Sequence, residues 1–173
     1  VIVENRPGAS SNIGPTVVLQ SPADGNTLLA SATYFTVNPL LGVKIPWDPK
    51  QFVSVARFGA APNVLVVPKT SPANTVAEFV ALAKSNPELP VSDPGLGSPQ
   101  RIAMEVLAQS AGFTVTFVQY KGGTSYVPDL MAGRLSAGFM PFNVVVSLIK
   151  NGDLKALALT SKDRSSLLPD VPT

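Results

Sequence analysis

The run Asn63-Val64-Leu65-Val66-Val67-Pro68 decides the fold predicted for this 173-residue chain. Its four central residues are all apolar, and three of them are β-branched. A strand formed by such a run has no polar face to turn toward water, which is typical of a strand covered on both sides by helices. We therefore predict a buried strand at 64–67 and an α/β fold around it.

Other short apolar runs repeat this pattern. After residue 64 they alternate with segments of helical spacing, and this alternation predicts βαβ units and an open, mostly parallel, twisted sheet. Ligands of such sheets bind outside the carboxyl ends of the strands. The predicted strands cover residues 27–30, 53–56, 64–67, 115–118 and 154–159, with a further short one just before Ser92.

Two of the predicted helices have clear start signals. Thr75 and Glu78 have the spacing of a capping box, in which each side chain accepts a hydrogen bond from the other residue's backbone amide. Ser98 followed by Pro99 is typical of an N-cap and first helical residue, and this helix is expected to end at Gly112. Two shorter helices are predicted at about 125–132 and 143–150.

Residue composition excludes several classes of function. The chain has no His and no Cys, which rules out catalytic triads and dyads that need imidazole or thiolate, His- or Cys-ligated zinc, disulfides and haem attachment within it. Its candidate acids, Asp93, Glu105, Asp129 and Asp153, are far apart in the sequence and form no recognisable acid/base pair. We expect no cofactor, no metal site and no enzymatic activity.

Charge and hydropathy argue against nucleic acid and membrane insertion. The 13 Lys and Arg residues are scattered and nearly balanced by 11 Asp and Glu residues, so no basic stripe is formed. The longest aliphatic stretch, 144–149, is far shorter than the roughly 20 residues that a membrane-spanning helix needs. The chain begins without the basic region and cleavage site of a signal peptide.

The loop from Ser92 to Gln100 is the most informative candidate site. Gly95, Gly97 and Ser98 come just before a predicted helix, where free backbone amides and the helix dipole favour an anion such as a carboxylate. A tight connection without any ligand is the alternative interpretation. The loop has neither the Gly-Lys-Ser/Thr of a P-loop nor the third glycine of a dinucleotide-binding motif.

Two further strand ends are weaker candidates. Tyr120-Lys121-Gly122 is followed by a second glycine and hydroxyl residues that open a helix, and Lys121 would add positive charge to the same anion site. A solvated lysine beside a helix end is the alternative. Ser31-Ala32-Thr33 places small polar residues after the predicted strand at 27–30.

Motifs in every part of the chain resemble one receptor family. They begin with Val1-Ile2-Val3-Glu4-Asn5-Arg6-Pro7-Gly8-Ala9 and end with Leu168-Pro169-Asp170-Val171-Pro172-Thr173. The matching segments between them, in the family's order, are 12–14, 22–29, 38–40, 48–52, 62–67, 120–122, 129–133 and 154–158. This combination resembles the solute-binding receptors of tripartite tricarboxylate transporters, the Bug/TctC type.

The resemblance implies a fold, a function and a site. The fold is like that of type II periplasmic binding proteins, a Venus flytrap of two α/β lobes with mostly parallel sheets. Such a receptor is periplasmic and monomeric, closes on a small organic carboxylate, and delivers it to the permease subunits of the transporter. Backbone amides and hydroxyls hold the carboxylate. The implied ligand-binding positions are Ser31, Ala32 and Thr33 in the first lobe and Gly95, Leu96, Gly97, Ser98, Tyr120, Lys121 and Gly122 in the second.

The resemblance also implies that the chain holds the second lobe whole, at 68–153, and the first lobe in part, at 1–67 and 154–173, because family members are longer. Two stretches depart from the family pattern. Pro99-Gln100-Arg101-Ile102 stands where relatives often have Ser-Ser-His-Leu, and Phe139-Met140-Pro141 stands where many have Phe-Asp-Asn. Loss of that Asp removes a partner for an amino group, which favours a non-amino carboxylate as the ligand.

Two other classes of function remain open at this point. The same type of lobe serves as the ligand-sensing module of signalling and transcription-regulatory proteins, which a helix-turn-helix segment would indicate. The other class is an enzyme that acts on carboxylates, such as an isomerase or hydrolase. The absence of His and of an acid/base pair argues against an enzyme.

Overall fold

The computed structural model describes residues 1–42, 45–121 and 124–173, so Gly122 lies outside the described residues. The strands are β1 (Asn63–Pro68), β2 (Pro90–Asp93), β3 (Thr116–Gln119), β4 (Gly138–Pro141) and β5 (Leu154–Leu159). The helices are α1 (Ile13–Leu19), α2 (Thr33–Val37), α3 (Val76–Ser85), α4 (Pro99–Ala111), α5 (Val127–Met131) and α6 (Phe142–Lys150), with 3-10 turns at Ala9–Ser11, Asn38–Leu41 and Pro49–Gln51.

The strands form a mixed sheet in which one strand runs against the others. β1 lies between β4 and β5 and is antiparallel to both. β2 and β3 are parallel, and the amide of Ser92 donates to the carbonyl of Ala137 over 3.1 Å, next to β4, through a parallel bridge. β2, β3, β4 and β5 therefore share one direction, and the predicted α/β fold with mostly parallel strands is confirmed, with β1 as the exception.

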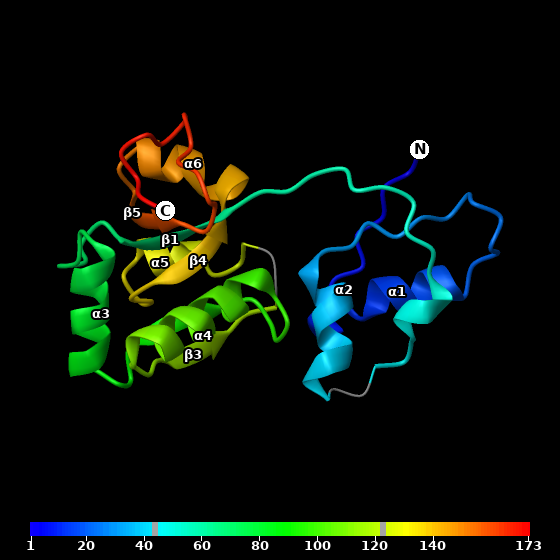
Figure 1. The fold of residues 1–173 in the computed structure, drawn as a ribbon, viewed down its shortest axis with the longest axis horizontal. Helices are drawn as coiled ribbons and strands as arrows, with labels where there is room; N and C mark the ends of the chain where they lie inside the picture. The colour runs from blue at the N-terminus through cyan, green and yellow to red at the C-terminus, as the bar shows by residue number, and fades with distance from the viewer. Residues whose placement is uncertain (43–44, 122–123) are drawn as a thin grey trace.

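Helices cover both faces of this sheet, as the apolar run at 64–67 predicts. Leu65 and Val67 point to one face, where they pack with Phe79 of α3 and Met104 of α4. Val64 and Val66 point to the other face, toward the residues of α5 and α6. All four of these β1 residues are at most 1% exposed, so the strand is buried on both sides. Figure 1 shows α3 and α4 on the side of the sheet opposite α6.

Both strong helix-start signals are confirmed. Thr75 Oγ1 accepts from the amide of Glu78 over 3.1 Å, and the Glu78 carboxylate accepts from the amide of Thr75 over 3.2 Å. The Ser98 hydroxyl accepts from the amide of Arg101 over 3.2 Å, so α4 begins at Pro99 as expected. These caps satisfy backbone donors that have no partner within their helix.

The strands predicted at 27–30 and 53–56 are wrong for this structure. Neither segment pairs as a strand, and apolar side chains in both face solvent, with Leu28 67% exposed and Val53 90% exposed. No described strand lies beside either segment, and a strand forms only where a neighbour supplies hydrogen bonds. This part of the chain is organised instead around a small aromatic cluster, in which Phe35 stacks on Trp47 at 4.9 Å and Phe52 meets both rings edge-on.

The described residues gather in two bodies. Figure 1 shows the N-terminal residues with α1 and α2 in one body, and the sheet with α3–α6 and the C-terminus in the other, joined by an extended segment that leads into β1. β1 and β5, which lie at the expected lobe boundaries, both pair in the sheet that contains β4. Their residues therefore share one sheet with a strand from the range 68–153.

Candidate functional site

Two of the predicted loops meet at one edge of the sheet. β2 and β3 run in parallel with Asp93 opposite Gln119, and the amide of Tyr120 donates to the carbonyl of Asp93 over 2.8 Å. The carboxyl ends of both strands therefore lie side by side. The loop at 95–98 follows Asp93 and Lys121 follows Tyr120, so both predicted anion-binding loops begin at this edge of the sheet. That they hold one ligand together stays a prediction.

The loop after β2 has a defined shape. The Asp93 carboxylate accepts from the amide of Gly95 over 2.9 Å, and the amide of Ser98 donates to the carbonyl of Gly95 over 3.1 Å. Gly95 and Gly97 have φ of 130° and 79°, values that favour glycine. Among the described residues, the amides of Leu96, Gly97 and Gln100 meet no acceptor, so they are free at the positive end of α4.

A second strand end supplies a phenol and an exposed ammonium group. Tyr120 Oη donates to Asp129 Oδ2 over 2.5 Å, and Arg134 Nε donates to Asp129 Oδ1 over 2.8 Å. Burial, and then the hydrogen bond to the Asp129 carboxylate, raise the pKa of Tyr120. The hydrogen bond from Tyr120, followed by that from Arg134, lowers the pKa of Asp129. Tyr120 is therefore a neutral, oriented side chain, while Lys121 is exposed at its side.

The third predicted loop lies in the other body. Ala32 is the N-cap residue of α2 and Thr33 is its first residue, and Ser31, Ala32 and Thr33 are all exposed. In the described part of the chain, no hydrogen bond joins these three residues to the loops after β2 and β3. Their place in a ligand site stays a prediction.

Two other residues of the N-terminal body do reach the loop after β2. A methyl group placed on Gly97 would lie 2.1 Å from Asn38 Oδ1, and one placed on Gly95 would lie 3.8 Å from Ser10 Oγ. The two bodies therefore touch where both loop glycines lack a side chain. Sequence reasoning missed Ser10 and Asn38, because nothing local to either residue indicates a partner some 60 to 85 positions further along the chain.

A buried network holds Ser10 and Asn38 in place. Asn38 Nδ2 donates to the carbonyl of Ser10 over 2.9 Å and to Asn12 Oδ1 over 3.3 Å, and Trp47 Nε1 donates to the same Asn12 oxygen over 3.1 Å. The backbone there is strained, since Ala9, Ser10 and Ser11 have φ of 48°, 50° and 67°. Left-handed conformations cost non-glycine residues about 1–2 kcal/mol each, so the network must stabilise this turn.

The loop after β2 also rests on an ion pair that the sequence patterns do not indicate. Asp93 is only 6% exposed, and its Oδ2 accepts from Arg101 Nη1 over 2.7 Å. Arg101 Nε contacts Glu105 Oε1 at 2.6 Å, and its guanidinium lies over the ring of Phe117 at 3.4 Å. Asp93 is therefore a buried structural acid and not a solvated one.

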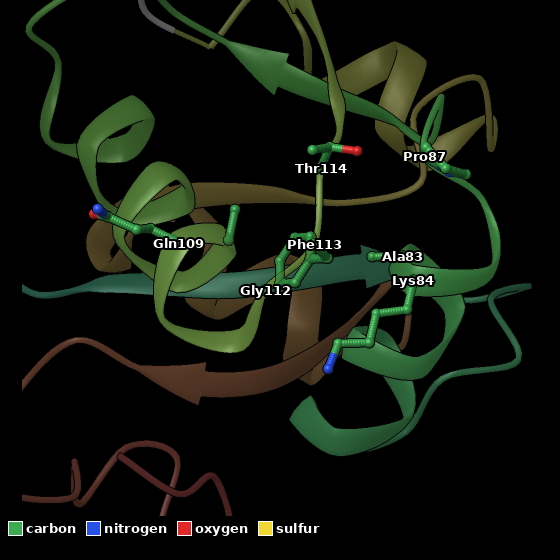
Figure 2. Close-up of a pocket in the computed structure, with 8 residues that line it drawn as sticks. Ala83, Lys84, Pro87, Gln109, Gly112, Phe113 and Thr114 are labelled. Atoms are coloured by element: carbon green, nitrogen blue, oxygen red, sulfur yellow. The ribbon is translucent and has the colours of Figure 1, made fainter.

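The hollows of the surface do not coincide with the predicted site. A cavity of about 400 Å³ lies between the C-terminal ends of α3 and α4, and Figure 2 shows Lys84, Gln109 and Phe113 around it. It lies at the C-terminal end of α4, whereas Ser98 lies at the N-terminal end of that helix. A second hollow of about 440 Å³ lies beside α1 and is lined by Ala9, Ser10, Asn12, Ile13, Thr16, Val17 and Pro46.

The residues that the structure describes contain neither a metal-binding cluster nor a membrane-spanning helix. Within them, no group of three or more Asp and Glu side chains is close enough to hold a metal ion. None of the helices in the described ranges is long and apolar enough to cross a bilayer.

The structure is an α/β sheet with a glycine-containing loop at the carboxyl edge, which is where ligands of such sheets bind. Residues 1–173 match the Tripartite tricarboxylate transporter family receptor, TctC, and the chain belongs to this family. It is 34% identical to the UPF0065 protein of the tcbD-tcbE intergenic region of Pseudomonas sp. strain P51 and 33% identical to BugT of Bordetella pertussis. All of this chain is covered, but only 52% and 54% of these proteins, so it spans about half their length.

Solved structures show the same fold. An R. palustris protein with adipate matches 99% of this chain and 58% of its own, with 30% identity and a TM-score of 0.93. MatC of Rhodopseudomonas palustris with bound malate matches 96% of this chain and 57% of its own, with 25% identity and a TM-score of 0.86. The chain therefore has the fold of part of a periplasmic binding protein.

Proposed function

We propose that this chain is the ligand-binding part of a receptor that captures a small organic carboxylate between two lobes. The observation that carries the proposal is that the carboxyl ends of β2 and β3 join at Asp93 and Tyr120, while Gly95 and Gly97 of the following loop face Ser10 and Asn38 of the N-terminal body. Family membership and the carboxylate-bound neighbours support the same ligand class.

The donors at this edge suit a carboxylate. Free amides of Leu96, Gly97 and Gln100 lie at the positive end of α4, and Lys121 adds an exposed positive charge. Most of these donors are backbone groups, which recognise the carboxylate and not the rest of the molecule. When the lobes close, water leaves and hydrogen bonds to the charged ligand become stronger.

Two observations support a ligand without an amino group. The position where many relatives have Asp is Met140, which is fully buried among the apolar side chains around α6. It provides no acceptor for an ammonium group. Adipate and malate, the ligands named for two neighbours, also lack an amino group. We propose mono-, di- or aromatic carboxylates as ligands, bound near the loop at 95–98.

The remaining parts of the proposal concern the whole receptor. We infer that it is periplasmic and monomeric, that it is not an enzyme, and that it delivers its ligand to the permease subunits of a tripartite tricarboxylate transporter. Ser31, Ala32, Thr33 and Gly122 complete the proposed site. For the lobes, we propose that 68–153 form the second lobe, together with the flanking strands β1 and β5 that pair in its sheet.

A titration tests this function. The full chain, and any longer receptor that carries it, is titrated calorimetrically with adipate, malate, benzoate, aspartate and the neutral diamide adipamide. We expect a carboxylate without an amino group to bind and adipamide to fail, because the amides and Lys121 select negative charge. Tight binding of aspartate alone would refute the non-amino ligand class, and turnover of any bound carboxylate would refute a receptor.

A further inference from the structure

We propose that Asp93 and Arg101 form a positioning pair, in which Asp93 shapes the carboxylate-binding loop and Arg101 neutralises the charge that Asp93 would otherwise present to the ligand. This inference rests on the proposed function and names the side chains that make the site compatible with an anion. Neither residue is needed as a direct ligand contact.

Asp93 shapes the loop through its first oxygen. Oδ1 accepts from the amide of Gly95 over 2.9 Å, within a buried setting, and this bond turns the chain just before the free amides at 96 and 97. Tyr120 is tied to the same residue, because its amide donates to the Asp93 carbonyl. Asp93 therefore fixes both parts of the proposed site relative to each other.

The negative charge of the Asp93 carboxylate disfavours the binding of an anion at the neighbouring loop. Its side chain is 8% exposed, and a buried negative charge beside the loop would oppose a second carboxylate, since charges in a poorly solvated setting interact strongly. The second oxygen of Asp93 meets Arg101 Nη1 at 2.7 Å, which balances this charge. A lone buried charge without such a partner is strongly unfavourable.

Two further contacts hold the Arg101 side chain in place. Glu105, one turn later on α4, holds Nε at 2.6 Å, and the ring of Phe117 on β3 lies under the guanidinium at 3.4 Å. A planar guanidinium can stack flat on a ring while its in-plane N–H groups donate to two carboxylates. These contacts hold Arg101 against Asp93, so we assign it to charge balance and not to ligand capture.

Three variants separate these roles: R101Q, D93N and the double variant D93N/R101Q. Asn at 93 keeps an oxygen for the Gly95 amide but removes the charge. The control R164Q removes one exposed guanidinium, whose Nη1 donates to the carbonyl of Pro169 over 3.1 Å. Each protein is titrated with adipate and malate at low and high ionic strength, and the Gly95 amide is followed by hydrogen exchange.

We expect R101Q to weaken carboxylate binding by roughly tenfold or more, with part of the loss recovered at high salt, because screening reduces charge repulsion. D93N/R101Q should bind within about threefold of wild type, and R164Q should match wild type. Gly95 exchange should accelerate in R101Q, because Arg101 no longer holds the Asp93 side chain against the loop.

Three results would overturn the proposal. They are wild-type affinity in R101Q, a double variant as weak as R101Q, or a loss in R101Q without any salt dependence. The second result would mean that Arg101 contacts the ligand directly. If the wild-type protein binds neither adipate nor malate, the ligand class is wrong, and unchanged Gly95 exchange in R101Q would then reject the positioning pair separately.

Discussion

Replacing Gly97 by alanine tests the contact between the two bodies. The added methyl would lie 2.1 Å from Asn38 Oδ1, so Asn38 must retreat by more than an ångström to reach ordinary van der Waals distance. That movement breaks the hydrogen bonds from Asn38 Nδ2 to Ser10 and Asn12, worth about 1 kcal/mol each. Alanine at φ 79° adds about 1–2 kcal/mol of backbone strain.

Gly112 provides a matched control for the strain. It has a similar φ of 68°, but a methyl group there would meet nothing within 4 Å. We therefore expect Gly97→Ala to lower the free energy of unfolding by about 2 kcal/mol more than Gly112→Ala, measured by urea denaturation with linear extrapolation. In an Asn38→Ala background, where the opposing amide is gone, the two glycine substitutions should cost the same.

Equal losses for Gly97→Ala and Gly112→Ala in the wild-type background would refute the contact. So would a difference between them that persists after Asn38→Ala, because the cost would then come from something other than this side chain. The affinity for a carboxylate provides an independent test of the contact between Gly97 and Asn38. Gly97→Ala should weaken binding, because Asn38 and the loop after β2 face one another across the proposed site.

Three further predictions concern the sheet body. Leu65→Ala should lower the free energy of unfolding by about 2–5 kcal/mol in urea denaturation, because Leu65 is only 1% exposed. The control Leu167→Ala, at a residue that is 52% exposed, should lower it by less than about 0.5 kcal/mol. Similar losses for the two variants would place Leu65 outside the core. Thr75→Ala should cost about 1 kcal/mol through the lost cap, and the exposed Thr114→Ala should be neutral. The pKa of Tyr120 is raised in the folded state, so its neutral phenol contributes stability that is fully present below pH 10. This stability is lost as the pH rises through the pKa of Tyr120 in the folded protein. The melting temperature of Tyr120→Phe should therefore fall less above pH 10 than that of the wild-type protein. Parallel melting curves for the two proteins would contradict the last prediction.

Sequence patterns predicted the sheet body well because its signals are local. The caps at Thr75 and Ser98 each involve two residues three positions apart. The uninterrupted apolar run at 64–67 is enough to indicate a strand buried on both faces. The same reasoning failed at 27–30 and 53–56. A run of apolar residues indicates that a strand is possible, but pairing needs a second strand, and no described segment provides one.

For the site, local patterns located the glycines and Tyr120 but not what faces them. The direction of α4 and the two glycines point to an anion near Ser98 without any knowledge of the rest of the chain. No local pattern indicated that Asp93 is buried, because its partner Arg101 lies on α4 and the ring that supports Arg101, Phe117, lies on β3.

The sequence by itself determined the class of fold, the start of each capped helix, the absence of imidazole and thiol chemistry, and the family resemblance that the comparisons confirmed. Only the tertiary structure decided that β1 runs against its neighbours, that Asn38 fits against Gly97, and that Arg101 balances a buried Asp93. The physical reason is the range of the interactions. Caps and periodic burial act within a few residues, whereas strand direction and contacts between the two bodies join residues that only the folded chain brings together.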